Sequence, residues 1–292
     1  MNIADLSRNT LSHLPIEISV EGRKMRVLSR FLDLAPALRV SDSFDAGYGR
    51  IRIDSGHPPQ RAMAYCFFNV LRSYTRSPLG RYMATLPLAG RTFVDVGANL
   101  GMYSLIATSM GAESYAVEPE PAYVGYLRKN AQLIGTVVPM ALSDRVGALP
   151  LYYYPDNYGA TSLVPSEGCR TSTDTVEVST FSKIALEGGF GDPEKIELIK
   201  IDVEGNEVAT VAGMHDFLET GQRPAIWCEV RGVSPRAHNS FREVATILLD
   251  RGYRYFDGNA TDPLSAKVPT DAEMQQRTIF DLLFVANARK CV

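Results

Sequence analysis

The chain has 292 residues, of which 45% are hydrophobic and 22% are charged, and its formal net charge is −3. These values are typical of one large globular α/β domain, or of one domain with an appendage. The small net charge gives no electrostatic reason to expect a nucleic-acid partner. No apolar run approaches the length of a membrane span, so we expect no membrane partner.

The cysteines and the start of the chain indicate the compartment. Cys66, Cys169, Cys228 and Cys291 lie far apart and lack metal-finger spacing, which is typical of reduced cytosolic thiols rather than of a disulfide framework. The first residues include Asp5 and lack the basic start and apolar core of a secretory signal. We therefore expect a cytoplasmic protein.

Residues 1–60 differ in pattern from the rest and predict a small β-containing extension. Residues 16–20 alternate apolar and polar side chains, Glu21-Gly22 is a turn pair, and residues 25–28 continue as a second strand. This pattern predicts a β-hairpin, and residues 49–53 are a candidate third strand. We interpret the extension as a cap or a dimerisation element. The second alternative would make the protein a homodimer.

Residues 61–292 alternate between helix and strand patterns and form the second predicted domain. We expect helices at about 61–74, 99–111, 121–135, 206–220 and 236–249. We expect strands at 92–96, 114–117, 136–141, 198–202, 225–229, 253–256 and 279–285, with a β-rich excursion over 146–180. Strands separated by helices imply a parallel sheet with right-handed crossovers, whereas the last two strands imply an antiparallel pair. Pro139 weakens the third strand because it cannot donate a ladder hydrogen bond.

The segment at 95–101 (DVGANLG) ends the first strand and opens a helix. Its glycines let backbone approach a ligand closely, and the helix N-terminus offers free N–H groups. The spacing differs from the dinucleotide fingerprint G-x-G-x-x-G. The carboxylate of Asp95 would repel pyrophosphate but suit an ammonium or a sulfonium. The alternative is a plain strand-to-helix turn.

Glu118 ends the second strand, where a carboxylate can accept hydrogen bonds from both ribose hydroxyls of a nucleoside. The segment after the third strand would lie beside an adenine ring, and Asp144 could accept from the adenine amino group. Asp144 could equally begin a turn toward Gly147. The candidate residues of this segment are Ala141, Leu142, Ser143 and Asp144.

Four segments in this order, 95–101 (DVGANLG), 117–119 (VEP), 141–144 (ALSD) and 200–207 (KIDVEGNE), resemble the FkbM family of S-adenosylmethionine-dependent methyltransferases. The resemblance covers about 91–285, and D-V-E-G-x-E is its most specific mark. It implies a Rossmann-like, seven-stranded class I methyltransferase sheet, mostly parallel with an antiparallel C-terminal strand, and O-methylation of a sugar or polyketide hydroxyl. It also implies that Glu118 holds the cofactor ribose. The residues implied to cradle its methionine end are Asp95, Gly97, Asn99 and Gly101.

Acidic residues follow the fourth and fifth strands. Asp202 and Glu204 end one strand and Glu229 ends the other, so all three would face one crevice. An aliphatic hydroxyl needs a base or a Lewis acid before it can attack, and three carboxylates could provide a base or bind Mg²⁺. Because Arg231 would reduce the negative charge of a metal cage, we favour deprotonation without an obligatory metal.

Other residues carry weaker signals. His238 follows the fifth strand and could be a base, whereas His215 lies within a predicted helix and is expected at the surface. Glu207 is interpreted as a helix N-terminal charge that complements the macrodipole. The tyrosine-rich segment 152–162 is either a lid whose rings stack on a sugar or a hairpin packed on the sheet edge.

The sequence therefore predicts an S-adenosylmethionine-dependent O-methyltransferase that acts on a small hydroxylated molecule, such as a sugar or a glycosylated natural product. The alternative from another class is a cofactor-binding scaffold or partner subunit without turnover. Such a protein would have no need of Asp202 and Glu204. An NAD-linked oxidoreductase is disfavoured by the glycine spacing.

Overall fold

The computed structural model describes residues 43–45, 50–52, 75–154, 157–165, 169–231, 240–260, 273 and 277–286. The hairpin expected at 16–28, the helix expected at 61–74 and His238 lie outside these residues. No helix within the described ranges is long and apolar enough to cross a membrane.

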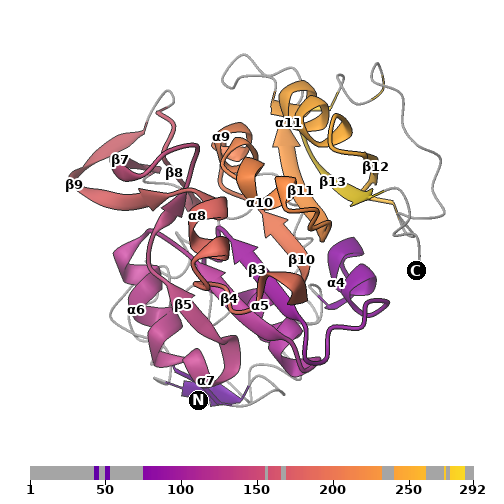
Figure 1. Cartoon of the computed structure of the whole chain (residues 1–292). Helices are drawn as coiled ribbons and strands as arrows, with labels where there is room; N and C mark the ends of the chain where they lie inside the picture. The colour runs from indigo at the N-terminus through magenta and orange to yellow at the C-terminus, as the bar shows by residue number, and fades with distance from the viewer. Residues whose placement is uncertain are drawn as a thin grey trace, which may run out of the picture.

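A seven-stranded sheet in the order β12-β13-β11-β10-β3-β4-β5 forms the centre of the fold (Figure 1). The five strands from β5 to β11 pair in parallel, and β13 is antiparallel to both β11 and β12. The predicted parallel sheet and its antiparallel C-terminal pair are confirmed. The strands are β3 (Thr92–Val96), β4 (Glu113–Val117), β5 (Thr136–Val138), β10 (Ile196–Ile201), β11 (Ala225–Arg231), β12 (Tyr253–Asp257) and β13 (Ile279–Ala286).

The strand order reverses between β3 and β10. The chain moves outward from β3 through β4 to β5 and then returns to place β10 on the other side of β3. In an open α/β sheet, ligands bind outside the carboxyl ends of the strands at such a reversal. The fold therefore places a crevice beside the ends of β3 and β10.

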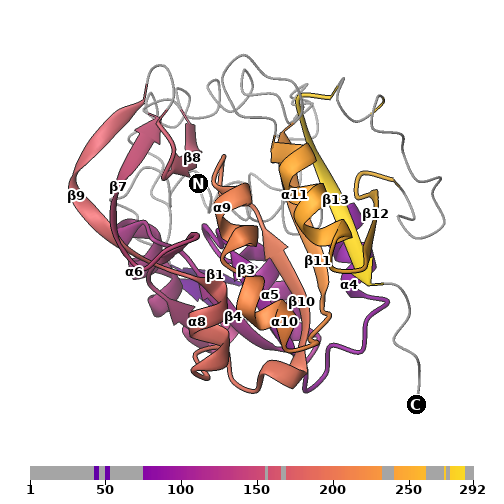
Figure 2. The same cartoon turned by 45° about the horizontal axis from the view of Figure 1, so that its top comes forward.

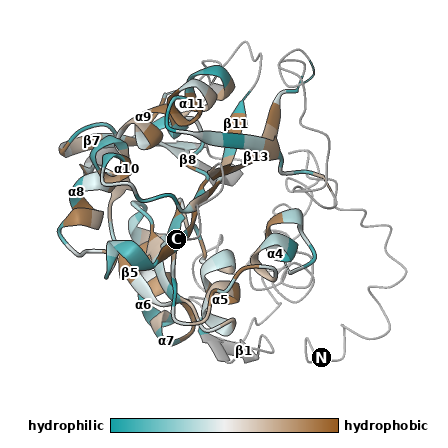
Figure 3. Ribbon diagram, turned by 45° about the vertical axis from the view of Figure 1, so that its right-hand side comes forward, coloured by the Kyte–Doolittle hydropathy of each residue, from teal (hydrophilic) through white to brown (hydrophobic). Residues whose placement is uncertain are grey.

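Helices cover both faces of this sheet (Figures 1 and 2). Helices α4 to α7 pack on one face and α8 to α11 on the other, and each face has its own buried core. Hydrophobic and hydrophilic residues are interleaved along α8 and α11 (Figure 3), as expected for amphipathic helices that cover a sheet. The helices are α4 (Pro78–Met83), α5 (Met102–Ser109), α6 (Pro121–Lys129), α7 (Ala131–Ile134), α8 (Phe181–Leu186), α9 (Glu207–Ala212), α10 (His215–Glu219) and α11 (Ser240–Leu249), with a 3-10 turn η1 (Pro193–Lys195).

The β-rich excursion forms a second sheet, in the order β6-β9-β7-β8. Its strands are β6 (Ala141–Leu142), β7 (Gly147–Tyr154), β8 (Asn157–Ser162) and β9 (Arg170–Ser179). The single strand expected at 136–141 is wrong, because β5 ends at Val138 and β6 joins the other sheet. Pro139 lies between the two strands and has no N–H to continue the first ladder.

Two of the expected helices are each divided into two. The helix expected at 206–220 ends at Gly213, where a Cβ would lie 2.1 Å from the carbonyl oxygen of Ser143, and α10 begins two residues later. The helix expected at 121–135 breaks at Asn130, which is fully buried. The Asn130 side chain accepts from the backbone N–H of Arg52 and donates to its carbonyl, both at 2.7 Å. Tertiary contacts therefore decide both breaks.

Strands β1 (Ser43–Asp45) and β2 (Arg50–Arg52) form a separate antiparallel pair. The candidate strand at 49–53 is confirmed as β2. Its bonds to Asn130 attach this part of the N-terminal extension to the helix layer formed by α6 and α7. The boundary of the extension at about residue 60 stays a prediction.

Candidate active site

An open pocket lies at the carboxyl ends of β3, β4 and β10, with one wall from the excursion sheet. Among the described residues that line it, the charged ones are Glu118, Asp202 and Glu204, and all three are acidic. A pocket with this lining suits a ligand that is cationic or rich in hydroxyl groups. Further predicted site residues in the lining are Gly97, Asn99, Ala141 and Leu142.

Gly97 brings the ends of β3 and β10 into contact. Its φ is 76°, and a Cβ at this position would lie 1.8 Å from the carbonyl oxygen of Asp202. The backbone N–H of Asp202 donates to the carbonyl of Val96 at 3.0 Å. Only glycine permits this approach, because any side chain would collide with backbone.

Glu118 is buried beside the pocket at the end of β4. Its carboxylate accepts the backbone N–H of Asn99 at 2.8 Å and that of Glu120 at 2.9 Å. Burial raises the pKa of Glu118 to about 7, although these two bonds oppose the shift. Asn99 itself has φ 50°, an uncommon conformation that directs its N–H toward Glu118.

The predicted adenine-side residues divide into two groups. Ala141 and Leu142 line the pocket. Ser143 is buried and donates its backbone N–H to Ser179 at 2.8 Å. Asp144 is exposed and hydrogen-bonded to Arg145 at 2.7 Å, which lowers its pKa. Contact between Asp144 and adenine stays a prediction.

Asp95 and Gly101 are buried away from the pocket lining. Asp95 is 1% exposed and accepts from the backbone N–H of Ser104 at 3.1 Å and from its hydroxyl at 2.7 Å. A Cβ on Gly101 would lie 2.8 Å from Leu127, so this glycine permits close packing of α5 on α6. Direct contact of these two residues with the cofactor stays a prediction.

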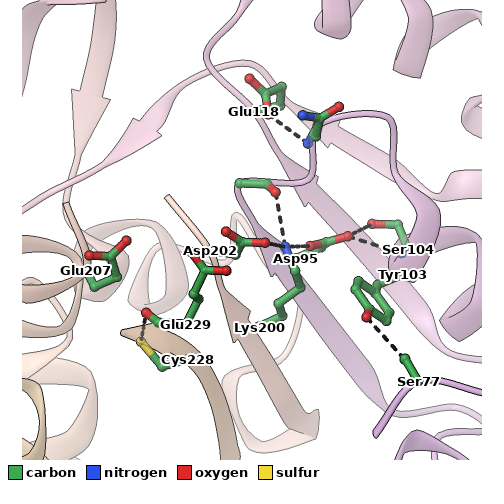
Figure 4. A network of polar contacts seen from close by, with 12 residues as sticks. Ser77, Asp95, Tyr103, Ser104, Glu118, Lys200, Asp202, Glu207, Cys228 and Glu229 are labelled. Atoms are coloured by element: carbon green, nitrogen blue, oxygen red, sulfur yellow. Dashed lines mark hydrogen bonds and ion pairs between the residues drawn. The ribbon is translucent and has the colours of Figure 1, made fainter. Parts of the chain in front are cut away.

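Three carboxylates converge near the carboxyl ends of β10 and β11. Asp202 and Glu204 follow β10, whereas Glu229, which was expected to end its strand, lies within β11 because that strand continues to Arg231. Oxygens of Asp202, Glu204 and Glu229 lie within 4.8 Å of one another, and Figure 4 shows Asp202 and Glu229 side by side. Glu204 has φ 55°, and Nη2 of Arg231 donates to its carboxylate at 2.6 Å. The spacing could hold a divalent cation, but Asp202 and Glu204 already face the cations of Lys200 and Arg231. A reaction without an obligatory metal stays a prediction.

Crowding shifts the ionisation of this cluster. Burial, followed by the nearby charge of Asp202, raises the pKa of Glu204 to about 7 and that of Glu229 to about 10. A second negative charge beside Asp202 is unfavourable, which favours the protonated form of Glu229.

Sequence reasoning missed two residues of this region. Asp281 lies opposite Glu229 in the β11–β13 ladder, and burial with the charge of Asp202 raises its pKa to about 6. Lys200 is 5% exposed and lies between Asp95 and Asp202. In the sequence, each of these residues is the one charged side chain among the apolar residues at one end of its strand, Lys200 in β10 and Asp281 in β13.

Glu207 and His215 lie outside the pocket lining. Glu207 is the first residue of α9, is fully buried, and accepts the backbone N–H of Gly205 at 2.7 Å. His215 is exposed at the start of α10, so its expected surface position is confirmed. Neither residue gains a catalytic role from its position.

The tyrosine-rich segment forms the β7–β8 hairpin, with Tyr152 and Tyr153 half-buried. Leu151, Thr161 and Ser162 from this hairpin line the pocket. The Ser162 hydroxyl also donates to the carbonyl of Glu204 at 2.8 Å, which joins the hairpin to the acidic cluster. Its action as a lid on a sugar stays a prediction.

The raised carboxyl pKa values predict how stability depends on pH. A carboxyl whose pKa is raised by folding stabilises the folded state below its unfolded pKa, and this contribution is lost as pH rises through the folded pKa. The melting temperature of the cofactor-free protein should therefore fall between pH 5 and about 8, given the pKa of about 7 for Glu118. Thermal unfolding of wild type and Glu118→Gln checks this, since the variant should show a shallower decline. Identical slopes would show that Glu118 does not titrate in this range.

A family model described as the methyltransferase FkbM domain matches residues 95–255. The chain belongs to this family. It is therefore a methyltransferase, and family membership confirms the expected cofactor, S-adenosyl-L-methionine. The match begins at the end of β3 and ends in β12, so it includes every predicted site residue.

Several curated proteins are similar in sequence. The 31-O-demethyl-FK506 methyltransferase FkbM of Streptomyces tacrolimicus is 28% identical over 65% of this chain and 82% of that protein. Methyltransferase sdnD of Sordaria araneosa is 30% identical over 59% of this chain and 76% of that protein. The hexuronic acid methyltransferase AglP of Haloferax volcanii is 31% identical, over 43% of this chain and 51% of that protein.

Among solved structures, the precorrin-6y C5,15-methyltransferase of Geobacter metallireducens GS-15 is 14% identical, with a TM-score of 0.40 over 72% of this chain and 87% of that one. The magnesium protoporphyrin IX methyltransferase of Synechocystis PCC 6803, solved with bound S-adenosylmethionine, is 13% identical, with a TM-score of 0.40 over 90% of this chain and 97% of that one.

Proposed function

We propose that this protein is an S-adenosylmethionine-dependent O-methyltransferase that acts on a hydroxyl of a small molecule, either a sugar or a glycosylated natural product. The observation that carries the proposal is the convergence of Asp202, Glu204 and Glu229 within 4.8 Å beside the pocket. An aliphatic hydroxyl is a poor nucleophile until a base takes its proton, and this cluster offers one.

The pocket residues fit the cofactor. Glu118 is held by two backbone N–H groups at the end of β4, where its carboxylate can accept the ribose hydroxyls. The acidic lining favours the positive charge of a sulfonium. When bound, S-adenosylmethionine supplies an electrophilic methyl group, and the chain must position the acceptor hydroxyl in line with it.

Asp202 is the residue we assign to proton removal. Burial and the neighbouring carboxylates favour the protonated form of Glu229, and Glu204 is bound to Arg231 at 2.6 Å, whereas the contact of Asp202 with Lys200 is longer, at 3.4 Å. Asp202 lines the pocket, and its side chain is 37% exposed. In the proposed reaction Asp202 accepts the proton that the acceptor hydroxyl loses as its oxygen is methylated. Glu204 and Glu229 orient the hydroxyl and keep the cluster from carrying three full negative charges.

The class of acceptor is inferred from the wall of the pocket and from the relatives. The hairpin region contributes the apolar side chains of Leu151 and Leu163 beside the hydroxyls of Thr161 and Ser162. This mixture suits a ligand that has both apolar surface and hydroxyl groups. The names of two relatives give 31-O-demethyl-FK506 and a hexuronic acid as the molecules that those proteins methylate. We extend this acceptor chemistry to the present chain as part of the proposal.

Replacing Glu118 by Ala should weaken binding of S-adenosylhomocysteine by about 1.5–3 kcal/mol, because the ribose hydroxyls lose a charged acceptor. Calorimetric titration of the purified protein measures this directly. Glu113→Ala is the matched control, because Glu113 is exposed at the opposite end of β4. Equal affinities for the two variants would remove Glu118 from the ribose role.

A further inference from the structure

Lys200 has three acceptors around its buried ammonium group (Figure 4). Its Nζ lies 3.2 Å from Oδ1 of Asp95, 3.4 Å from Oδ2 of Asp202 and 3.1 Å from the carbonyl oxygen of Gly97. A lysine ammonium has three N–H donors, so every donor has a neighbouring acceptor. These acceptors come from the ends of two strands that meet at the reversal of the sheet.

Strand register explains this position. Lys200 pairs with Asp95 across β10 and β3, so the two side chains leave the sheet side by side on the face covered by α5. Tyr103 and Ser104, both in α5, cover the side chains of Lys200 and Asp95. The Tyr103 ring centre lies 5.8 Å from Nζ, and Ser104 hydrogen-bonds the other oxygen of Asp95.

The ammonium stays charged in this setting. Burial alone would lower the pKa of Lys200, but the carboxylates of Asp95 and Asp202 outweigh that effect and raise it above its ordinary value. Removing the ammonium would leave Asp95 as a buried carboxylate without a counter-charge, which is strongly destabilising.

Neutralising Asp95 accounts for only one of the three contacts. The other two acceptors, the Gly97 carbonyl and the Asp202 carboxylate, belong to residues that line the pocket. One cation therefore connects the turn that faces the cofactor with the carboxylate assigned to proton removal.

We propose that Lys200 is a positioning residue, which holds the Gly97 turn in the arrangement that binds the cofactor and fixes the Asp202 carboxylate beside that turn. The proposal rests on the proposed function. Lys200 acts through Gly97 and Asp202 and does not itself line the pocket. Its effect should therefore appear in cofactor affinity even when the stability of the fold has been restored.

The test compares Lys200→Met with the double variant Asp95→Asn/Lys200→Met. The single variant should have a lowered melting temperature, because Asp95 loses its counter-charge. The double variant removes both charges and should recover most of that loss, while the amide oxygen of the new side chain still accepts from Ser104. Calorimetric titration with S-adenosylhomocysteine should show at least about tenfold weaker binding for both variants, with one site per folded molecule. Asp95→Asn alone is the control for the neutralised carboxylate.

Recovery of wild-type affinity in the double variant would overturn the proposal, because Lys200 would then serve only to neutralise Asp95. If the methionine variants do not fold, Lys200→Arg tests the same proposal. A planar guanidinium keeps the charge but cannot direct its donors at three diverging acceptors, so affinity should fall at least about threefold. Wild-type affinity in this variant would equally contradict the proposal. A wild-type protein that fails to bind S-adenosylhomocysteine would instead refute the proposed function.

Discussion

Replacing Asp202 by Asn should lower the rate of methyl transfer by about 10²–10⁴-fold, because the amide cannot accept the proton of the acceptor hydroxyl. The affinity for S-adenosylhomocysteine should change far less, since the side chain keeps its size and the ribose contact at Glu118 is unaltered. Transfer of a labelled methyl group measures the rate, and calorimetric titration measures the affinity.

Asp216→Asn is the matched control for this prediction. Its side chain is 77% exposed at the start of α10, outside the pocket lining. An Asp202→Asn enzyme as active as this control would show that Asp202 is not the base. Both enzymes should be assayed with added Mg²⁺ and with a chelator, because loss of wild-type activity on chelation would support a metal held by the carboxylate cluster.

Replacing Gly97 by Ala should destabilise the protein by about 3 kcal/mol or more and abolish cofactor binding. The added Cβ would lie 1.8 Å from the carbonyl oxygen of Asp202, so the ends of β3 and β10 would have to separate. Denaturant unfolding measures the loss of stability, and titration with S-adenosylhomocysteine measures the loss of binding.

Gly188→Ala separates the collision from simple backbone strain. Gly188 has φ 80°, close to the 76° of Gly97, but a Cβ there would meet nothing within 4 Å. This control should cost only about 1–2 kcal/mol, the penalty of a left-handed conformation, and should bind the cofactor normally. Equal effects of the two substitutions would mean that contact between the strand ends does not shape the site.

Local sequence patterns were sufficient to predict the elements that position the site. Thr92–Val96 and Ile196–Ile201 are largely apolar segments that lead into acidic residues and glycine, and both are strands whose carboxyl ends face the pocket. This worked because a strand buried on both faces of a parallel sheet has a nearly continuous apolar sequence. The convergence of Asp202 and Glu229 followed from the rule that such strand ends share one edge of the sheet.

Features that depend on contacts between distant segments could not be predicted in the same way. The pairing of Lys200 with Asp95 requires the register of β10 against β3, which no local pattern contains. The break between α9 and α10 depends on the approach of Ser143 to Gly213. The ion pair of Asp144 with the adjacent Arg145 was available from the sequence, but its exposure was not.

We propose that this protein transfers a methyl group from S-adenosylmethionine to a hydroxyl oxygen. The most direct measurement incubates the enzyme with S-adenosylmethionine carrying a ¹³C-labelled methyl group and a panel of hydroxylated sugars and glycosides, and then identifies the labelled product by NMR. We predict a methyl ether signal that depends on enzyme and is lost in Asp202→Asn. A label attached to nitrogen, sulfur or carbon instead would show that the protein is not an O-methyltransferase.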